Sequence, residues 1–227
     1  MIYLRWLFAL ALVAACTSCS DGVIVFPTPE SAFVRIINTS RNLAPSRITI
    51  DSSTIIDTER GLFSTYTPAA AGRPIQFDIG STTKDYRTGL RYTLGGGARI
   101  ILFVRGDTSS TVEFRREIQD TVLPSNASES VIRFTHMAEF TDKAYFVEVW
   151  TSAGTKLFPE EYEPGISSRF YARIAPGTYS FELREAGTTT VVATLQNVVV
   201  VPGRSYMLYS YDSKPPIPDQ VALQLAY

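Results

Sequence analysis

The chain has 227 residues, of which 45% are hydrophobic, and its 21 basic and 22 acidic side chains give a formal net charge of -1. This near-neutral charge implies neither nucleic acid nor an anionic membrane surface as an electrostatic partner, and the hydrophobic content excludes a mostly disordered chain. Because β-branched and aromatic side chains are abundant, we expect mainly β structure.

The N-terminus has the organisation of a secretory signal. Arg5 is followed by an apolar run over 6–15 that ends in small residues. This run is shorter than the roughly 20 apolar residues of a membrane-spanning helix. Val13-Ala14-Ala15-Cys16 resembles the lipobox of bacterial lipoproteins, in which the cysteine thiol accepts diacylglycerol and becomes the first residue of the mature chain. We therefore predict a signal peptide over 1–15, lipidation at Cys16 and a lipid anchor in the bacterial cell envelope, at the outer membrane.

Two alternatives concern the cysteines. A plain secreted protein would carry Cys16 incidentally, and lipidation at Cys19 would place Cys16 where a lipobox normally has Leu or Val. A disulfide between the two would close a small, strained loop. Since the chain has 2 cysteines in all, disulfides do not hold the fold together, and burial of a core must do so.

Alternating apolar patterns follow a predicted tether over 16–30, which contains Pro27 and Pro29. In the segment 74–79 the apolar side chains fall on one face and the polar ones on the other, the period of a strand with one wet side. The first series of predicted strands covers 32–37, 47–50, 74–79, 98–104 and 111–114.

A second series begins after a predicted linker over 120–129, whose Pro, Asn and Ser content is typical of a loop. No helical repeat competes with it. Short strands separated by turn residues predict a sandwich or barrel. The strands of this series are predicted at 130–136, 145–150, 169–174, 178–183, 189–195, 205–211 and 221–227.

Blocks of the two series match in the same order, which predicts a tandem duplication with domains over 31–119 and 130–227. The matched blocks are 33–36 with 131–134, 48–50 with 147–149, 71–79 with 176–183, 99–102 with 204–207 and 112–114 with 221–223.

The second series also resembles a known family. Ile132-Arg133-Phe134-Thr135-His136, Val147-Glu148-Val149, the segment 175–183 (APGTYSFEL) and Pro202-Gly203-Arg204-Ser205-Tyr206 are similar to the DUF4397 domain of bacterial envelope and secreted proteins. The first series is similar only loosely, with Asn38 in place of the histidine. The resemblance implies an all-β fold of two tandem immunoglobulin-like antiparallel β-sandwich domains. It implies no established activity.

The sequence contains few residues that could support catalysis. His136 is the only histidine and is followed by Glu139 and Asp142, which suggests a base with an orienting carboxylate. A triad would also need a serine on a strained elbow, and no G-x-S-x-G occurs. We therefore expect no enzyme and a structural role for His136, whose imidazole would bind a nearby loop.

Metal and cofactor sites are equally poorly supported. The acidic cluster Glu160, Glu161 and Glu163 lacks the pattern of a calcium loop, and zinc lacks ligands. The glycines at 95–97 precede a strand, so they predict a turn rather than a phosphate cradle. We expect neither a metal nor a cofactor.

The aromatic side chains of the second series have two possible roles, because such residues either fill cores or stack on sugar rings. We predict a non-catalytic envelope lipoprotein that acts as a structural or interaction module. A carbohydrate-binding accessory lipoprotein is the alternative. The expected partners are the membrane, through the lipid anchor, and an envelope protein or a glycan, but not nucleic acid. The aromatic residues in question are Phe158, Tyr162, Phe170, Tyr171, Tyr206, Tyr209 and Tyr211.

Overall fold

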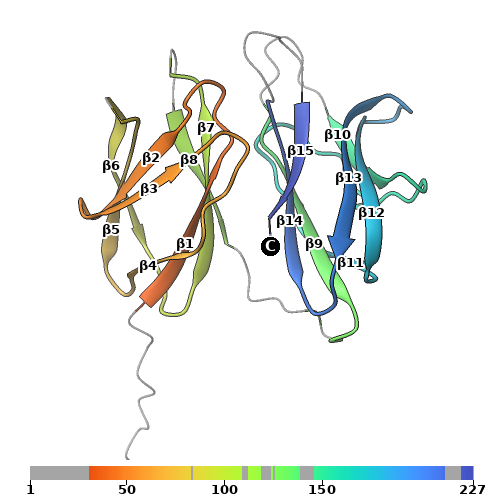
Figure 1. Cartoon of the computed structure of the whole chain (residues 1–227), viewed down its shortest axis with the longest axis horizontal. Helices are drawn as coiled ribbons and strands as arrows, with labels where there is room; N and C mark the ends of the chain where they lie inside the picture. Colours follow the sequence, from red (N-terminus) through yellow and green to blue (C-terminus); the bar gives the residue numbers. More distant parts are fainter. Residues whose placement is uncertain are drawn as a thin grey trace, which may run out of the picture.

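The computed structural model describes residues 31–82, 84–108, 112–118, 124, 126–138, 146–212 and 221–226, so Cys16 and the predicted tether lie outside the described residues. The described residues form strands and turns with no helix, and the predicted all-β fold is confirmed (Figure 1). The strands are β1 (Ser31–Asn38), β2 (Ser46–Ile50), β3 (Thr54–Thr58), β4 (Thr67–Ala70), β5 (Pro74–Gly80), β6 (Asp85–Thr93), β7 (Arg99–Gly106), β8 (Val112–Ile118), β9 (Ser130–His136), β10 (Val147–Thr151), β11 (Ala172–Ile174), β12 (Gly177–Glu185), β13 (Val191–Val200), β14 (Ser205–Asp212) and β15 (Val221–Ala226).

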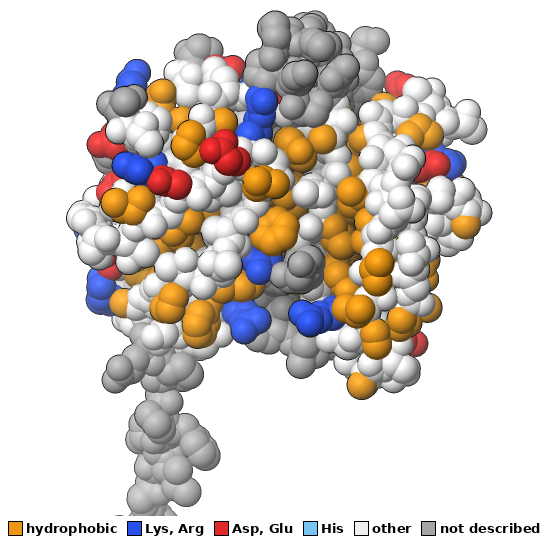
Figure 2. Space-filling view, in the orientation of Figure 1, with side chains coloured by type: hydrophobic (Ala, Val, Ile, Leu, Met, Phe, Trp, Pro, Cys, Tyr) orange, Lys and Arg blue, Asp and Glu red, His pale blue; other side chains and the backbone are white. Residues whose placement is uncertain are grey.

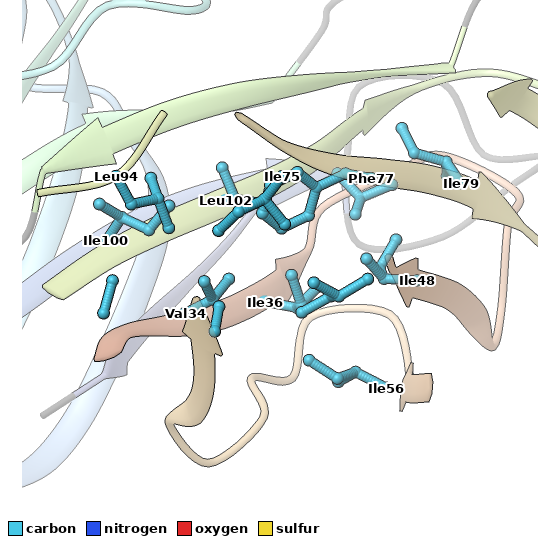
Figure 3. Close-up of a cluster of buried hydrophobic side chains, with 14 of the residues drawn as sticks. Val34, Ile36, Ile48, Ile56, Ile75, Phe77, Ile79, Leu94, Ile100 and Leu102 are labelled. Carbon is cyan, nitrogen blue, oxygen red and sulfur yellow. The ribbon is translucent and has the colours of Figure 1, made fainter. Parts of the chain in front are cut away.

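Strands β1–β8, which we call the N-terminal half, form two sheets around one apolar cluster. One sheet has the order β4-β1-β7-β8 and the other β3-β2-β5-β6. Alternate residues of each strand point into the space between the sheets, as strand geometry dictates. Figure 3 shows this cluster, in which Ile36 of β1, Phe77 of β5 and Leu102 of β7 are fully buried.

Strands β9–β15, the C-terminal half, repeat this arrangement. The sheet β11-β9-β14-β15 lies against the sheet β10-β12-β13. Their inward side chains, among them Phe134, Phe181 and Leu208, form a second fully buried cluster. The predicted boundaries of the two domains and their immunoglobulin-like character stay predictions.

Each half contains one parallel pair of strands in an otherwise antiparallel arrangement. β1 runs parallel to β7, and β9 runs parallel to β14. Phe33 pairs with Arg99 in the first of these pairs, whereas Val131 pairs with Ser205 in the second. Arg99 therefore corresponds to Ser205, and the sequence match of 99–102 with 204–207 was wrong by one residue.

This one-residue shift matters because it exchanges the two faces of a strand. In the corrected register Ile101 corresponds to Met207 and Phe103 to Tyr209. The side chains of these four residues point away from the core of their own half. They pack in a third buried cluster, which joins the two halves. Figure 1 shows the two sheets that contribute to it, those of β1 and β7 and of β9 and β14, in the middle of the molecule.

Three strands were not predicted, and each departs from simple alternation. β6 contains Gly89 in the left-handed region at φ 74°, and its pairing with β5 shifts register. β4 is an edge strand of 4 residues with a proline, Pro68, a residue that edge strands tolerate. In β3 the large apolar side chain of Ile55 is 57% exposed. The apolar residues of this strand therefore do not indicate which of its faces is buried.

Candidate functional site

The single histidine is a buried structural residue. His136 ends β9 with no exposed surface, and its Nδ1 lies 2.6 Å from Oγ of Ser210 on β14. The imidazole also stacks on the ring of Phe134, with 6.2 Å between centroids. The partner of Nδ1 thus lies on a strand, and the predicted contact of the imidazole with a loop stays a prediction. Glu139 and Asp142 lie outside the described residues.

The backbone of His136 does hold a loop, in a pattern that recurs in the other half. The N–H of His136 donates to the carbonyl of Ile166 at 2.9 Å, and the N–H of Gly165 donates to the carbonyl of His136 at 2.6 Å. Asn38 makes the same pair of bonds with Leu62 and Gly61, at 3.1 and 2.7 Å. The two positions are therefore equivalent anchors for the segment that leads into β4 or β11.

The Asn38 side chain shows what this position requires. Its amide nitrogen donates to the carbonyls of Leu43 at 2.7 Å and Thr58 at 2.9 Å, and its Oδ1 accepts from the hydroxyl of Ser40 at 2.6 Å. Each of these groups is buried, and a buried polar group is stable only when it is hydrogen-bonded. A polar side chain at this strand end therefore satisfies the neighbouring backbone.

We expect His136→Ala to lower the free energy of unfolding by about 1–3 kcal/mol, because Ser210 loses its partner and is left buried. His136→Asn, which restores the residue type of the N-terminal half, should recover part of that loss. Thermal unfolding followed by circular dichroism measures both. A His136→Ala protein as stable as the parent would contradict the structural role.

The contact between the halves has the pattern of a two-fold symmetric interface, in which equivalent residues exchange roles. A Cβ on Gly61 would lie 2.2 Å from the hydroxyl of Tyr211, and a Cβ on Gly165 would lie 2.5 Å from Nη1 of Arg105. Gly61 and Gly165 are equivalent, and so are Tyr211 and Arg105 in the corrected register. Each glycine thus lets a side chain of the opposite half approach its backbone.

Tyr209 lies at the centre of this interface. Its ring is fully buried with its centroid 5.8 Å from that of Phe103, in an edge-on arrangement. Its hydroxyl donates to the carbonyl of Gly61 at 2.8 Å. Burial raises the pKa of Tyr209, the neighbouring Tyr211 raises it further, and the positive charge of Arg35 opposes the shift.

Within each half, arginines lie over tyrosine rings. Arg35 lies over Tyr66 with its Cζ 4.2 Å from the centroid, and Arg99 lies 5.2 Å from the same ring. Arg133, the equivalent of Arg35, lies 5.7 Å from the ring of Tyr171. Figure 2 shows basic side chains gathered at the lower part of the hollow between the halves.

The charge of these arginines acts on Tyr66. Burial raises the pKa of Tyr66, while Arg35 and Arg99 lower it. Cation–ring contacts of this kind contribute roughly 0.5–2 kcal/mol each. Each contact joins residues of the same half, so these contacts stabilise the two halves individually.

Most of the aromatic side chains considered for sugar stacking fill cores instead. Phe158, Tyr162 and Tyr206 belong to the cluster of the C-terminal half, and Tyr209 and Tyr211 belong to the interface. Phe170, in contrast, is 68% exposed.

Trp150 is an aromatic residue that sequence reasoning passed over. It is half-buried on the outer face of the sheet β10-β12-β13, because its neighbour Val149 points into the core. Its Nε1 donates to Oε2 of Glu148 at 2.9 Å, and the guanidinium of Arg184 lies 4.7 Å from the ring. The signal for this position was the alternation of Val147, Glu148, Val149 and Trp150.

The other predicted features lie in loops. The hydroxyl of Tyr162 donates to Glu160 Oε2 at 3.1 Å, and no group of metal-ligating side chains occurs among the described residues. The predicted turn at 95–97 is confirmed between β6 and β7. In the part of the chain that the structure describes, no helix has the length and apolar character to cross a membrane.

Comparisons with known proteins add little. No protein-family model matches the chain, and no curated protein sequence matches it. One of the solved structures that match is a Bacteroides thetaiotaomicron protein of the DUF1812 group, described as a candidate polysaccharide-binding protein. That protein is 8% identical, with 85% of this chain and 96% of that chain covered, and the TM-score is 0.23. A likeness this weak carries no argument about function.

Proposed function

We propose that this protein is a non-catalytic lipoprotein of the bacterial cell envelope, anchored through Cys16 at the outer membrane, whose two halves act as one rigid interaction module related to DUF4397 proteins. The observation that carries the proposal is the interface between the halves. A buried apolar cluster, the hydrogen bond from Tyr209 to Gly61 and the contacts at both glycines fix one half against the other. A body of this kind presents its outer surfaces in a constant geometry.

The absence of catalysis in this proposal is supported by the use of His136. A general base needs access to the proton that it abstracts. The imidazole of His136 is buried against Phe134 and Ser210 instead, at the position that Asn38 occupies in the other half. The histidine thus occupies a buried structural position that an amide side chain occupies in the other half.

The anchor is tested by removing the thiol. Cys16→Ala should transfer the protein from the detergent phase to the aqueous phase in a phase-separation assay, because acylation requires the sulfur and more than one acyl chain gives stable anchoring. Cys19→Ala is the matched control and should stay in the detergent phase. Retention of Cys16→Ala in the detergent phase would refute lipidation at this position.

A carbohydrate-binding accessory role is the second candidate. The observation that favours it is Trp150, a partly buried indole on an outer sheet face, whereas Tyr162 and Tyr206 are buried in the core. An indole has an apolar body with one hydrogen-bond donor, a combination suited to surfaces that are partly apolar and partly wet.

A further inference from the structure

The outer face of the sheet β10-β12-β13 carries two rows of side chains that run across its strands. In the first row Trp150 pairs with Glu182, and Glu182 pairs with Thr194. In the second row Glu148 pairs with Arg184, which pairs with the 44% exposed Val191. Since neighbouring strands are about 4.8 Å apart, each row spans roughly 10 Å.

The charged groups of this face are held in place by one another. Glu148 accepts from Nζ of Lys156 at 2.8 Å as well as from the indole N–H of Trp150 at 2.9 Å. The Lys156 ammonium holds the pKa of Glu148 below its usual range, and burial opposes the shift. The Nε of Arg184 donates to Oε2 of Glu182 at 2.9 Å while its guanidinium lies against the indole ring.

We propose that this face binds a neutral saccharide, with Trp150 as the apolar contact and the partly exposed Glu182 and Arg184 as the hydrogen-bonding groups. The inference depends on the carbohydrate-binding role given above as the second candidate, and it supplies the site and the ligand class. Two carboxylates and two cations, those of Lys156 and Arg184, balance the charge. A face without net charge offers no electrostatic attraction to a polyanion.

The chemistry of Trp150, Glu182 and Arg184 suits hydroxyl-rich ligands. A carboxylate oxygen has more than one lone-pair direction, so Glu182 can accept a further hydrogen bond from a sugar hydroxyl. Glu148 is buried and positions the indole through its hydrogen bond from Nε1. The guanidinium of Arg184 lies over the indole ring and keeps its N–H donors in the guanidinium plane. The C–H face of a sugar provides the apolar surface that an indole requires.

Intrinsic fluorescence tests this directly, because the chain contains 2 tryptophans, Trp6 and Trp150. In the full chain carrying Trp6→Phe, the tryptophan emission, excited selectively over that of the 12 tyrosines, comes from Trp150 alone. Titration with neutral gluco-, manno- and galacto-oligosaccharides should give a saturable change in emission with at least one of them. A uronic-acid oligosaccharide of matched length should give none.

Isothermal titration calorimetry of variants then locates the site. Trp150→Ala and Glu182→Gln should each weaken binding of the responding oligosaccharide at least tenfold, with circular dichroism confirming the fold. Phe170→Ala, which removes an exposed aromatic residue elsewhere in the C-terminal half, should leave binding unchanged.

Three outcomes would count against the proposal in different ways. Undiminished binding by Trp150→Ala would overturn the site while the carbohydrate-binding role stands. Binding of the uronic-acid oligosaccharide alone would overturn the ligand class. An absence of binding to every oligosaccharide would overturn the carbohydrate-binding role as well, leaving the lipid anchor, which the Cys16 variant tests separately.

Discussion

Tyr209→Ala is expected to lower the free energy of unfolding by about 3–5 kcal/mol, the usual cost of truncating a large buried aromatic side chain. The ring packs edge-on against Phe103 of the opposite half, so its loss removes contacts that join the halves. We also expect the single unfolding transition to separate into two, since each half retains its own core. Urea denaturation followed by far-UV circular dichroism and by fluorescence measures both effects.

Tyr209→Phe is the matched control for this variant. It keeps the ring and removes only the hydroxyl that donates to the carbonyl of Gly61, which should cost about 1 kcal/mol. The transition should remain single. If Tyr209→Ala were no more destabilising than Tyr209→Phe, the packing of this ring would not be what holds the halves together.

Gly61→Ala should destabilise the protein by about 2–5 kcal/mol, as the sum of two separable effects. The first is backbone strain of roughly 1–2 kcal/mol, because Gly61 has φ 74°, in the left-handed region. The second is overpacking of about 1–3 kcal/mol, because the added methyl would overlap the ring of Tyr211 from the opposite half.

Gly72→Ala isolates the first effect. Gly72 has nearly the same φ, 76°, but nothing lies within 4 Å of the position of its Cβ. The difference between the loss of stability caused by Gly61→Ala and that caused by Gly72→Ala therefore measures the overpacking at the interface. Tyr211→Ala in the Gly61→Ala background should remove that excess, which a double-mutant cycle detects. If both glycine variants lost the same free energy of unfolding, the ring of Tyr211 would be able to move away from the added methyl group without destabilising the protein.

The sequence could predict strands wherever apolar and polar residues alternate. β5 was located almost to the residue because its apolar side chains recur at every second position. β6 was missed because Gly89 and the register shifts interrupt its period, and β4 because its short edge segment contains Pro68. These irregularities depend on how the strand pairs with its neighbours, which a single sequence does not record.

The candidate sites were harder to predict, for a reason visible in β7. Its run Ile100-Ile101-Leu102-Phe103 is apolar on both faces, a pattern typical of strands covered on both sides. The sequence therefore contained a signal that the N-terminal half is covered by something, but not that the C-terminal half covers it. Likewise Tyr206 and Trp150 are both aromatic residues in strands, and only the pairing of their strands decides that one is buried and the other faces outward.

The sequence alone was enough to predict the all-β class and the positions of most strands, and it shows that residues 13–16 resemble a lipobox. Each of these features depends on residues that are close together in the chain. Only the tertiary structure decided the one-residue register that makes Phe103 and Tyr209 meet, the burial of His136, and the position of Trp150 on an outer sheet face. These depend on which sheet faces lie against each other. That choice is made by side chains more than 100 positions apart, as the hydrogen bond between Tyr209 and Gly61 illustrates.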